Sequence, residues 1–151
     1  MVISELNFFS GKRVFITGHT GFKGTWLTQI MVRSGAIVCG YSLPNVDDKS
    51  HFNELGLKDS ISHVEGDIRD QDQLSKAMND FKPDIVFHLA AQALVKLAYT
   101  DPSDTYSTNV MGSLNILQAV NNCESVRSLI YVTSDKCYEN VEWEWGYRET
   151  D

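Results

Sequence analysis

The chain has 151 residues, of which 42% are hydrophobic and 22% are charged, and its formal net charge is -7. This composition and length are typical of one globular domain that buries a core without disulfide bonds. The acidic balance, with no basic run, argues against a nucleic-acid partner, and no apolar run is long enough to cross a membrane.

The first predicted elements are a strand, a glycine-rich loop and a helix. Residues 13–17, "RVFIT", are β-branched and aromatic, as expected of a buried strand. "GHTGFKG" follows, and apolar residues then recur at helical spacing from Phe22 to Ile30 until Gly35 closes the helix. Residues 36–42, "AIVCGYS", predict the second strand.

The alternation of strand and helix continues along the chain. A weak helix at "SHFNELGL" precedes a short strand around "SHVEG". Asp70, with a glutamine three residues later, resembles a capping box and predicts a helix that Pro83 ends. "DIVFHLAA" is the clearest buried strand. Asp101 and Pro102 predict the start of a long helix that reaches about Asn122, and "SLIYVTS" predicts the fifth strand.

This alternation predicts the fold class. Strands that alternate with helices are usually parallel and joined by right-handed crossovers. We therefore expect an α/β fold, a Rossmann-type doubly wound parallel sheet in the strand order 3-2-1-4-5 with helices on both faces. No repeat, low-complexity tract or linker divides the sequence, so residues 1–151 are expected to form a single domain.

Cysteines, histidines and the first residues add three expectations. Cys39, Cys123 and Cys137 are widely spaced and form no CxxC pair, which predicts reduced thiols in a cytoplasmic protein. The four histidines show no ligand spacing, so no metal is expected. "MVISELNFFSGKR" lacks the basic start and long apolar core of a signal peptide.

Three glycines form a GxxGxxG pattern between the first predicted strand and helix. In Gly18, Gly21 and Gly24, one glycine would permit the tight turn, another would admit a pyrophosphate, and the last would let the helix pack on the strand. The helix N-terminus then offers free N–H groups to phosphates. An ordinary strand–helix turn is the alternative, and the context favours a dinucleotide.

Three other residues of this loop are less informative. Phe22 and Lys23 stand at the predicted phosphate site, and Lys23 is as easily a solvent-exposed residue as a phosphate contact. His19 is expected to be a surface residue of the loop without a role.

Residues after the second and third strands complete the expected adenosine site. Dinucleotide folds usually have an acid at the end of the second strand, which binds the ribose. Ser42 stands there instead, so either the register of this strand is misjudged or discrimination between NAD and NADP is weaker. In "GDIRD", Asp67 with the adjacent Ile68 offers an acceptor for the adenine amino group, whereas Asp70 fits a helix cap.

Several segments together resemble a known enzyme family. "GHTGFKG", "GYSL", "GDIRD", "FHLAAQ", "YSTNVMG", and "TSDKCYEN" followed by "EWEWGYRE" are similar to the extended short-chain dehydrogenase/reductases, and within them to the CDP-glucose 4,6-dehydratase group. The resemblance covers nearly the whole chain. It implies NAD as cofactor, the nucleotide sugar CDP-glucose as substrate, and a homodimer or higher oligomer at full length.

The reaction that the resemblance implies has three stages. Hydride leaves C4 of the glucose, water leaves from C6 after loss of the C5 proton, and the hydride returns to C6. The product is CDP-4-keto-6-deoxyglucose, a precursor for polysaccharide biosynthesis. An epimerase or dehydratase of another nucleotide sugar is the alternative within the family. A non-catalytic NAD(P)-binding module is the alternative outside it.

The segment "TSDK" follows the fifth strand, at the sheet edge where ligands of such folds bind. The resemblance implies that Ser134 bonds the sugar C4 oxygen, with Thr133 sharing or replacing it, and that Asp135 protonates the departing C6 hydroxyl. Lys136 would be the C5 base after a large decrease in its pKa, or would stabilise the enolate as a cation. An exposed ion pair in a turn is the alternative for the last two.

The "HLAAQ" segment and the long helix supply further candidates. Ala90, Ala91 and Gln92 are expected to lie against the nicotinamide half of the cofactor. Asn109 either braces this site through a hydrogen bond or lies on a solvated helix face. His88 is expected to be a packed, hydrogen-bonded core residue.

The last residues carry aromatic side chains but not the expected catalytic pair. Tyr138, Trp143 and Trp145 either form a platform for the sugar or base, or pack only within their segment. The family's Tyr-x-x-x-Lys pair is expected after Asp151, and Tyr147 has no lysine four residues on. The chain is therefore expected to be the N-terminal portion of an enzyme, without its later strands and substrate domain, and inactive alone.

Overall fold

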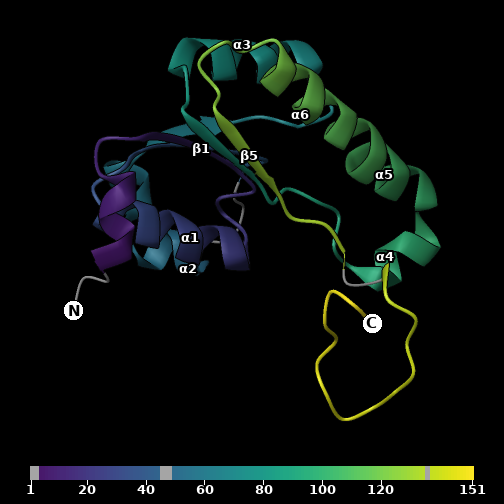
Figure 1. Ribbon diagram of the computed structural model, residues 1–151. Helices are drawn as coiled ribbons and strands as arrows, with labels where there is room; N and C mark the ends of the chain where they lie inside the picture. Colours follow the sequence, from purple (N-terminus) through teal and green to yellow (C-terminus); the bar gives the residue numbers. More distant parts are fainter. Residues whose placement is uncertain (1–3, 45–48, 135–136) are drawn as a thin grey trace.

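A computed structural model describes residues 4–44, 49–134 and 137–151 (Figure 1). Five strands form one sheet in the order β3-β2-β1-β4-β5, and all their pairings are parallel. The strands are β1 (Arg13–Thr17), β2 (Ile37–Ser42), β3 (Ser62–Glu65), β4 (Ile85–His88) and β5 (Ser128–Tyr131). The predicted Rossmann-type sheet and its strand order are confirmed.

Helices cover both faces of this sheet (Figure 1). α1 (Phe22–Arg33) and α2 (His51–Glu54) lie on one face, and α3 (Gln71–Phe81) and α6 (Gly112–Asn121) lie on the other. The shorter elements are η1 (Ser4–Phe9), η2 (Leu57–Ser60), α4 (Val95–Thr100), α5 (Pro102–Tyr106) and η3 (Ser107–Met111). Across the described residues, every helix is too short or too polar to cross a membrane.

Strand β1 is buried on both of its faces. Val14 and Ile16 pack in one cluster with Met31 of α1, whereas Phe15 packs in a second cluster with Met78 of α3. Side chains alternate across a strand, so this one strand contributes to two cores. Complete burial of each such side chain stabilises the fold by about 1.5 to 3 kcal/mol.

Helix α1 lies where the apolar spacing predicted it, but its buried face is different. Phe22, Trp26 and Ile30 are 69%, 48% and 42% exposed. The buried residues are Gly24, Thr25, Thr28 and Met31. Apart from Met31, these residues are small, because the helix starts so close to the end of β1.

Only half of the predicted capping box forms at the start of α3. The Asp70 carboxylate accepts a hydrogen bond from the backbone N–H of Gln73 at 3.0 Å, which confirms the cap. The Gln73 side chain turns instead to the sheet, where it accepts from the Tyr41 hydroxyl at 3.2 Å and donates to the Glu65 carbonyl at 3.2 Å. Gln73 therefore joins α3 to β2 and β3.

The long helix expected from Asp101 to about Asn122 has three segments. The Asp101 side chain caps α5 by accepting from the Asp104 N–H at 3.0 Å, as predicted. η3 is a π-helical turn between α5 and α6, a type of turn that often occurs at functional sites. α4 was not among the predicted elements. β5 ends at Tyr131, earlier than predicted, although the Val132 N–H still donates to the His88 carbonyl at 3.1 Å.

Candidate functional site

A cavity of about 440 Å³ opens at the carboxyl ends of the strands. The loops after β1, β2, β3 and β4 line it, together with side chains from α4, α5 and η3. The order of the strands changes direction at β1, because β2 lies on one side of it and β4 on the other. Ligands of open parallel sheets bind at such a point, so this cavity is the candidate dinucleotide site.

Most of the predicted cofactor residues line this cavity: Gly18, Gly21, Ser42, Asp67, Ile68, Ala90, Ala91 and Gln92. The structure thus brings together residues that are up to 74 positions apart in the sequence (92 − 18). Phe22, Lys23 and Gly24 do not line it. Phe22 and Lys23 are exposed at the start of α1, so their contacts with phosphate remain predictions.

The glycines hold the loop after β1 against its neighbours. Gly18 has a φ of +71°, and a Cβ there would lie 2.8 Å from the Ala90 nitrogen. A Cβ on Gly24 would lie 2.0 Å from the Gly18 carbonyl oxygen. The Gly21 N–H donates to that same oxygen at 3.1 Å. The β1 loop, the β4 loop and α1 therefore pack in backbone contact, which only residues without a side chain at positions 18 and 24 allow.

The end of β2 presents hydroxyl groups to the cavity. Ser42 is the last residue of β2, so the possibility of a misjudged register is wrong. The Thr20 hydroxyl donates to the Ser42 hydroxyl at 3.1 Å, and Ser42 donates to the Leu43 carbonyl at 3.1 Å. Thr20 was not predicted, since threonine in a glycine-rich loop carries no distinctive spacing.

The loop after β3 contributes a charged network. The Arg69 guanidinium binds both oxygens of the Asp67 carboxylate, with its shortest contact at 2.6 Å, and donates to Asp104 of α5 at 2.7 Å. The hydrogen bonds from Arg69 hold the pKa of Asp67 below its usual value. Asn115 of α6 fixes the same loop by donating to the Ile68 and Arg69 carbonyls at 2.9 and 3.1 Å.

Asn109 forms hydrogen bonds with the loop after β4, which is one of the two roles predicted for it. Its side-chain oxygen accepts from the Gln92 N–H at 2.8 Å, and its side-chain nitrogen donates to the Gln92 carbonyl at 3.0 Å. The Gln92 side chain donates to the Thr105 hydroxyl at 2.7 Å. The π-helical turn thus anchors the wall at which the nicotinamide half is expected.

His88 is a packed core residue, as predicted. It is buried at the end of β4, and its Nδ1 lies 2.7 Å from the Thr17 hydroxyl. That hydroxyl accepts from the N–H groups of Leu89 and Ala90 at 3.2 and 3.3 Å, so its own proton points to His88 Nδ1. The histidine therefore carries its proton on Nε2, and burial lowers its pKa to about 4.

The expectation that His19 is a surface residue is wrong. Its ring is fully buried, 2.7 Å from His63 Nδ1 and edge-on to Phe52. The space exists because Gly40 in β2 has no side chain, and a Cβ there would lie 2.3 Å from the ring. Burial, with a smaller contribution from His63, lowers the His19 pKa to about 4.

These two histidines predict a loss of stability in acid. Their pKa values fall from 6.5 to about 4 on folding, so the unfolded chain takes up protons first as pH decreases. The stabilisation is complete above pH 6.5 and is lost as pH falls from 6.5 towards 4, by about 2 kcal/mol per histidine at pH 5. The variant His88→Asn keeps an acceptor for Thr17 but does not titrate.

Urea unfolding at pH 7.5 and pH 5 measures this loss. We expect His88→Asn to lose about 2 kcal/mol less than the parent chain over that interval. The matching change at the exposed His51 should leave the difference unaltered. Equal losses of unfolding free energy in the parent chain and in His88→Asn would show that His88 does not cause the loss of stability in acid.

The predicted catalytic segment is only partly described. Thr133 and Ser134 are exposed and follow β5, and neither lines the cavity. Asp135 and Lys136 lie outside the described residues. The catalytic roles of all four therefore remain predictions.

The aromatic residues of the last segment pack with one another. Tyr138 stacks on Tyr147 with ring centroids 5.3 Å apart, and Trp143 lies 5.5 Å from the same ring. Trp145 is 74% exposed. Packing within the segment is thus observed for Tyr138 and Trp143, and a contact of any of these three aromatic residues with sugar or base remains a prediction.

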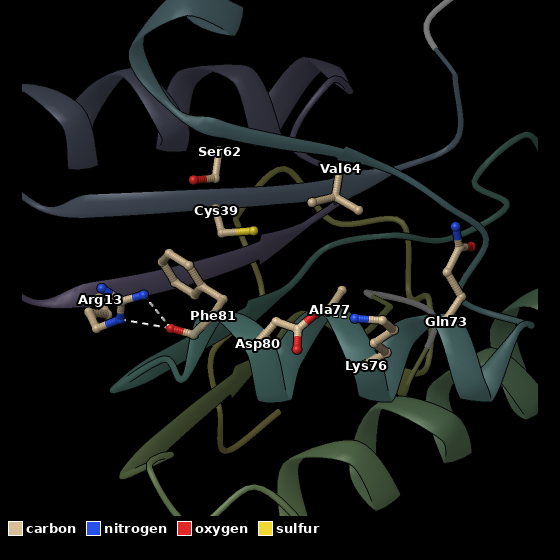
Figure 2. Close-up of a pocket in the computed structure, with 9 residues that line it drawn as sticks. All are labelled: Arg13, Cys39, Ser62, Val64, Gln73, Lys76, Ala77, Asp80 and Phe81. Atoms are coloured by element: carbon tan, nitrogen blue, oxygen red, sulfur yellow. Dashed lines mark hydrogen bonds and ion pairs between the residues drawn. The ribbon is translucent and has the colours of Figure 1, made fainter.

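A second cavity, of about 470 Å³, lies between α3 and the sheet (Figure 2). Figure 2 shows that its charged groups are already engaged: Arg13 bonds the Phe81 carbonyl, and Lys76 pairs with Asp80 at 2.5 Å. Burial raises the pKa of the Cys39 thiol there to about 12, so it stays protonated and unreactive. Within the described residues, no group of three or more metal-ligating side chains gathers here or elsewhere.

Comparison with known proteins places the chain in a family. The sequence profile of the GDP-mannose 4,6 dehydratase family matches residues 15–151. The chain belongs to this family. Members of the GDP-mannose 4,6 dehydratase family are enzymes. The resemblance found in the sequence motifs agrees with this membership.

Curated relatives of this family member are longer than the chain itself. It is 50% identical over 97% of its residues to the CDP-glucose 4,6-dehydratase of Salmonella typhimurium, and 30% identical over 92% to the CDP-paratose 2-epimerase of Salmonella typhi. In each case it spans 41% of the relative. The predicted similarity to the CDP-glucose 4,6-dehydratase group is confirmed.

Solved structures share the fold of this family member. An epimerase of Methanothermobacter thermautotrophicus matches all of the chain over 44% of its own length, with a TM-score of 0.83 and 28% identity. The UDP-glucose 4-epimerase of Thermus thermophilus, solved in complex with NAD, matches 77% of the chain and 36% of its own length, with a TM-score of 0.67 and 28% identity.

Proposed function

We propose that the chain is the NAD-binding part of a nucleotide-sugar 4,6-dehydratase that acts on CDP-glucose. The cavity at the carboxyl ends of the strands carries this proposal, because three separate motifs, GxxGxxG, GDIRD and HLAAQ, meet in its walls. The 50% identity to a CDP-glucose 4,6-dehydratase supports the substrate, and NAD in the related epimerase structure supports the cofactor.

The residues of the cavity fit NAD. Gly18 and Gly21 line it without side chains, which would let the backbone approach a pyrophosphate. Asp67 is held ionised beside the expected adenine position, and the Asn109–Gln92 pair fixes the opposite wall. NAD, when bound, would accept hydride from the sugar C4 and return it to C6.

The residues after β5 would act on the sugar. Ser134, with or without Thr133, would bond the C4 oxygen and hold it beside the cofactor. Asp135 would donate a proton to the departing C6 hydroxyl. Lys136 would either take the C5 proton or stabilise the enolate oxygen by its charge.

These 151 residues alone should bind the dinucleotide without turning over the sugar. None of their six tyrosines is followed four residues later by a lysine. In the family that the sequence resembles, a tyrosine and a lysine at this spacing activate the C4 hydroxyl of the sugar. We also propose a cytoplasmic location and a homodimer or higher oligomer at full length. Val110, Leu114 and Leu117, which are exposed on η3 and α6, support the oligomer.

Titration calorimetry with NAD, paired with product analysis by NMR, tests this function. We expect the 151-residue chain to bind NAD and to leave CDP-glucose unchanged. The natural gene product, if its mass approaches that of the relatives, should convert CDP-glucose to the 4-keto-6-deoxy sugar and spare UDP- and dTDP-glucose. Failure of the chain to bind NAD would contradict the proposal. Conversion of UDP-glucose to an epimer by the natural gene product would show that the enzyme is an epimerase and not a dehydratase.

A further inference from the structure

The Tyr131 hydroxyl joins the end of β5 to helix α6. Tyr131 is the last residue of β5, and its hydroxyl oxygen lies 2.5 Å from the hydroxyl oxygen of Ser113 in α6. The Ser113 hydroxyl donates its one proton to the Asn109 carbonyl at 2.5 Å, because a carbonyl oxygen can only accept. Tyr131 is therefore the donor to Ser113, and the direction of both hydrogen bonds is fixed.

These two hydrogen bonds end on the π-helical turn η3. At the end of this turn a backbone N–H donates to the carbonyl five residues earlier, where an α-helix would use the carbonyl four residues earlier. The Ser113 hydroxyl supplies a donor to the Asn109 carbonyl beside this irregularity. The side chain of Asn109 in turn holds the backbone N–H and carbonyl of Gln92. The Tyr131 hydroxyl is thus linked to the wall at which the nicotinamide half is expected.

The same tyrosine anchors the end of β5. Among the described strands, β5 lies at the edge of the sheet and pairs with β4 alone. The Val132 N–H donates to the His88 carbonyl at 3.1 Å, and the Tyr131 ring lies 4.9 Å from the His88 ring. On the face covered by α6, the Tyr131 hydroxyl adds the hydrogen bond to that helix. Thr133 and Ser134 follow, and at about 3.3 Å per residue Ser134 lies within about 10 Å of this anchor.

We propose that Tyr131, acting through Ser113, is a positioning residue that sets the distance between the catalytic segment after β5 and the nicotinamide wall. The inference rests on the proposed function, in which Ser134 holds the C4 oxygen of the sugar and NAD accepts the C4 hydride. Reacting atoms must lie about 3 to 3.5 Å apart, and a misplacement of about 1 Å can slow a reaction about 100-fold. A hydrogen bond that ties the two sides together therefore affects hydride transfer more than it affects NAD binding.

The test follows the reduction of bound NAD when the full-length gene product is mixed with CDP-glucose. The absorbance of the reduced nicotinamide gives a first-order rate constant and an amplitude. The amplitude depends on the fraction of enzyme that is folded, whereas the rate constant does not. CDP-glucose with deuterium at C4 identifies the phase, because the isotope slows hydride transfer.

We expect Tyr131→Phe, which removes only the hydroxyl, to lower the rate constant about five- to tenfold and to change the Kd of NAD by less than about twofold. Ser113→Ala should lower the rate constant at least as much. The double variant should be no slower than Ser113→Ala, because the two hydroxyls act as one unit. Ser113→Thr keeps a hydroxyl and should retain the rate of the parent. Tyr106→Phe is the matched control, because Tyr106 is 69% exposed on α5.

Other results would contradict the inference. A smaller amplitude with an unchanged rate constant in Tyr131→Phe would show that the hydroxyl only supports the fold. A loss of NAD affinity as large as the loss of rate would show that it acts on cofactor binding. An unchanged rate constant and amplitude would show that the hydrogen bond has no role in the reaction. A parent enzyme that binds NAD but does not reduce it with CDP-glucose would contradict the proposed function, and this inference with it.

Discussion

Replacing Gly24 by alanine is expected to destabilise the protein by about 3 to 5 kcal/mol and to abolish dinucleotide binding. The new Cβ would lie 2.0 Å from the Gly18 carbonyl oxygen and 2.8 Å from the His19 Cα. Both are backbone atoms, so α1 must move away from the end of β1. Alanine favours a helix over glycine by only about 1 kcal/mol, which is too little to offset this clash.

Thermal unfolding measures the effect of Gly24→Ala. For a chain of this length the expected loss lowers Tm by roughly 10 to 15 °C. Gly146→Ala serves as control, because a Cβ there meets nothing within 4 Å and should leave Tm unchanged. A Tm for Gly24→Ala equal to or above that of the parent would contradict this prediction, because it would show that the loop and the helix can accommodate a methyl group at this position.

The second large effect is expected for Asn115→Asp. The side-chain nitrogen of Asn115 is buried and donates to the carbonyls of Ile68 and Arg69. A carboxylate there would face two oxygens without a proton to donate, so we expect a loss of about 3 to 5 kcal/mol at pH 7.5. The loop that carries Asp67 would lose its anchor, and NAD affinity should decrease.

The pH dependence of Asn115→Asp separates this cause from general damage to α6. Burial and the facing carbonyls would raise the pKa of the introduced carboxyl in the folded state above its unfolded value of about 3.9. The folded variant then binds the proton more tightly, so its deficit relative to the parent should shrink as pH falls from 7.5 to 5. Asn121→Asp, exposed on the same helix, should differ from the parent by a few tenths of a kcal/mol at either pH.

The sheet could be predicted from the sequence because its signals are local. "RVFIT" and "DIVFHLAA" are apolar over a strand's length, and glycine or proline marks the element ends. Asp70 and Asp101 capped the helices they were expected to start. The alternation of elements then left few possible strand orders.

The parts that could not be predicted depend on contacts between distant residues. The partner of Arg69 on α5 is 35 residues away, and the position of His19 depends on the missing side chain of Gly40. Helical spacing located α1 but not its buried face, because the close approach of helix and strand selects small residues over large ones. A single sequence carries no direct signal for such pairs.

The central position of β1 also affects how the protein is made. β1 needs both β2 and β4 as neighbours, and Val14 pairs with Ile85, 71 residues later. At the usual rate of translation, about 5 to 20 residues per second, that interval lasts about 4 to 14 s. During this time β1, which is apolar from Val14 to Ile16, has one unpaired edge, which makes the nascent chain prone to aggregation. Because the glycine loop and the loop after β4 meet only when β4 has docked, the cavity proposed to bind the dinucleotide would form at the same step that removes this hazard.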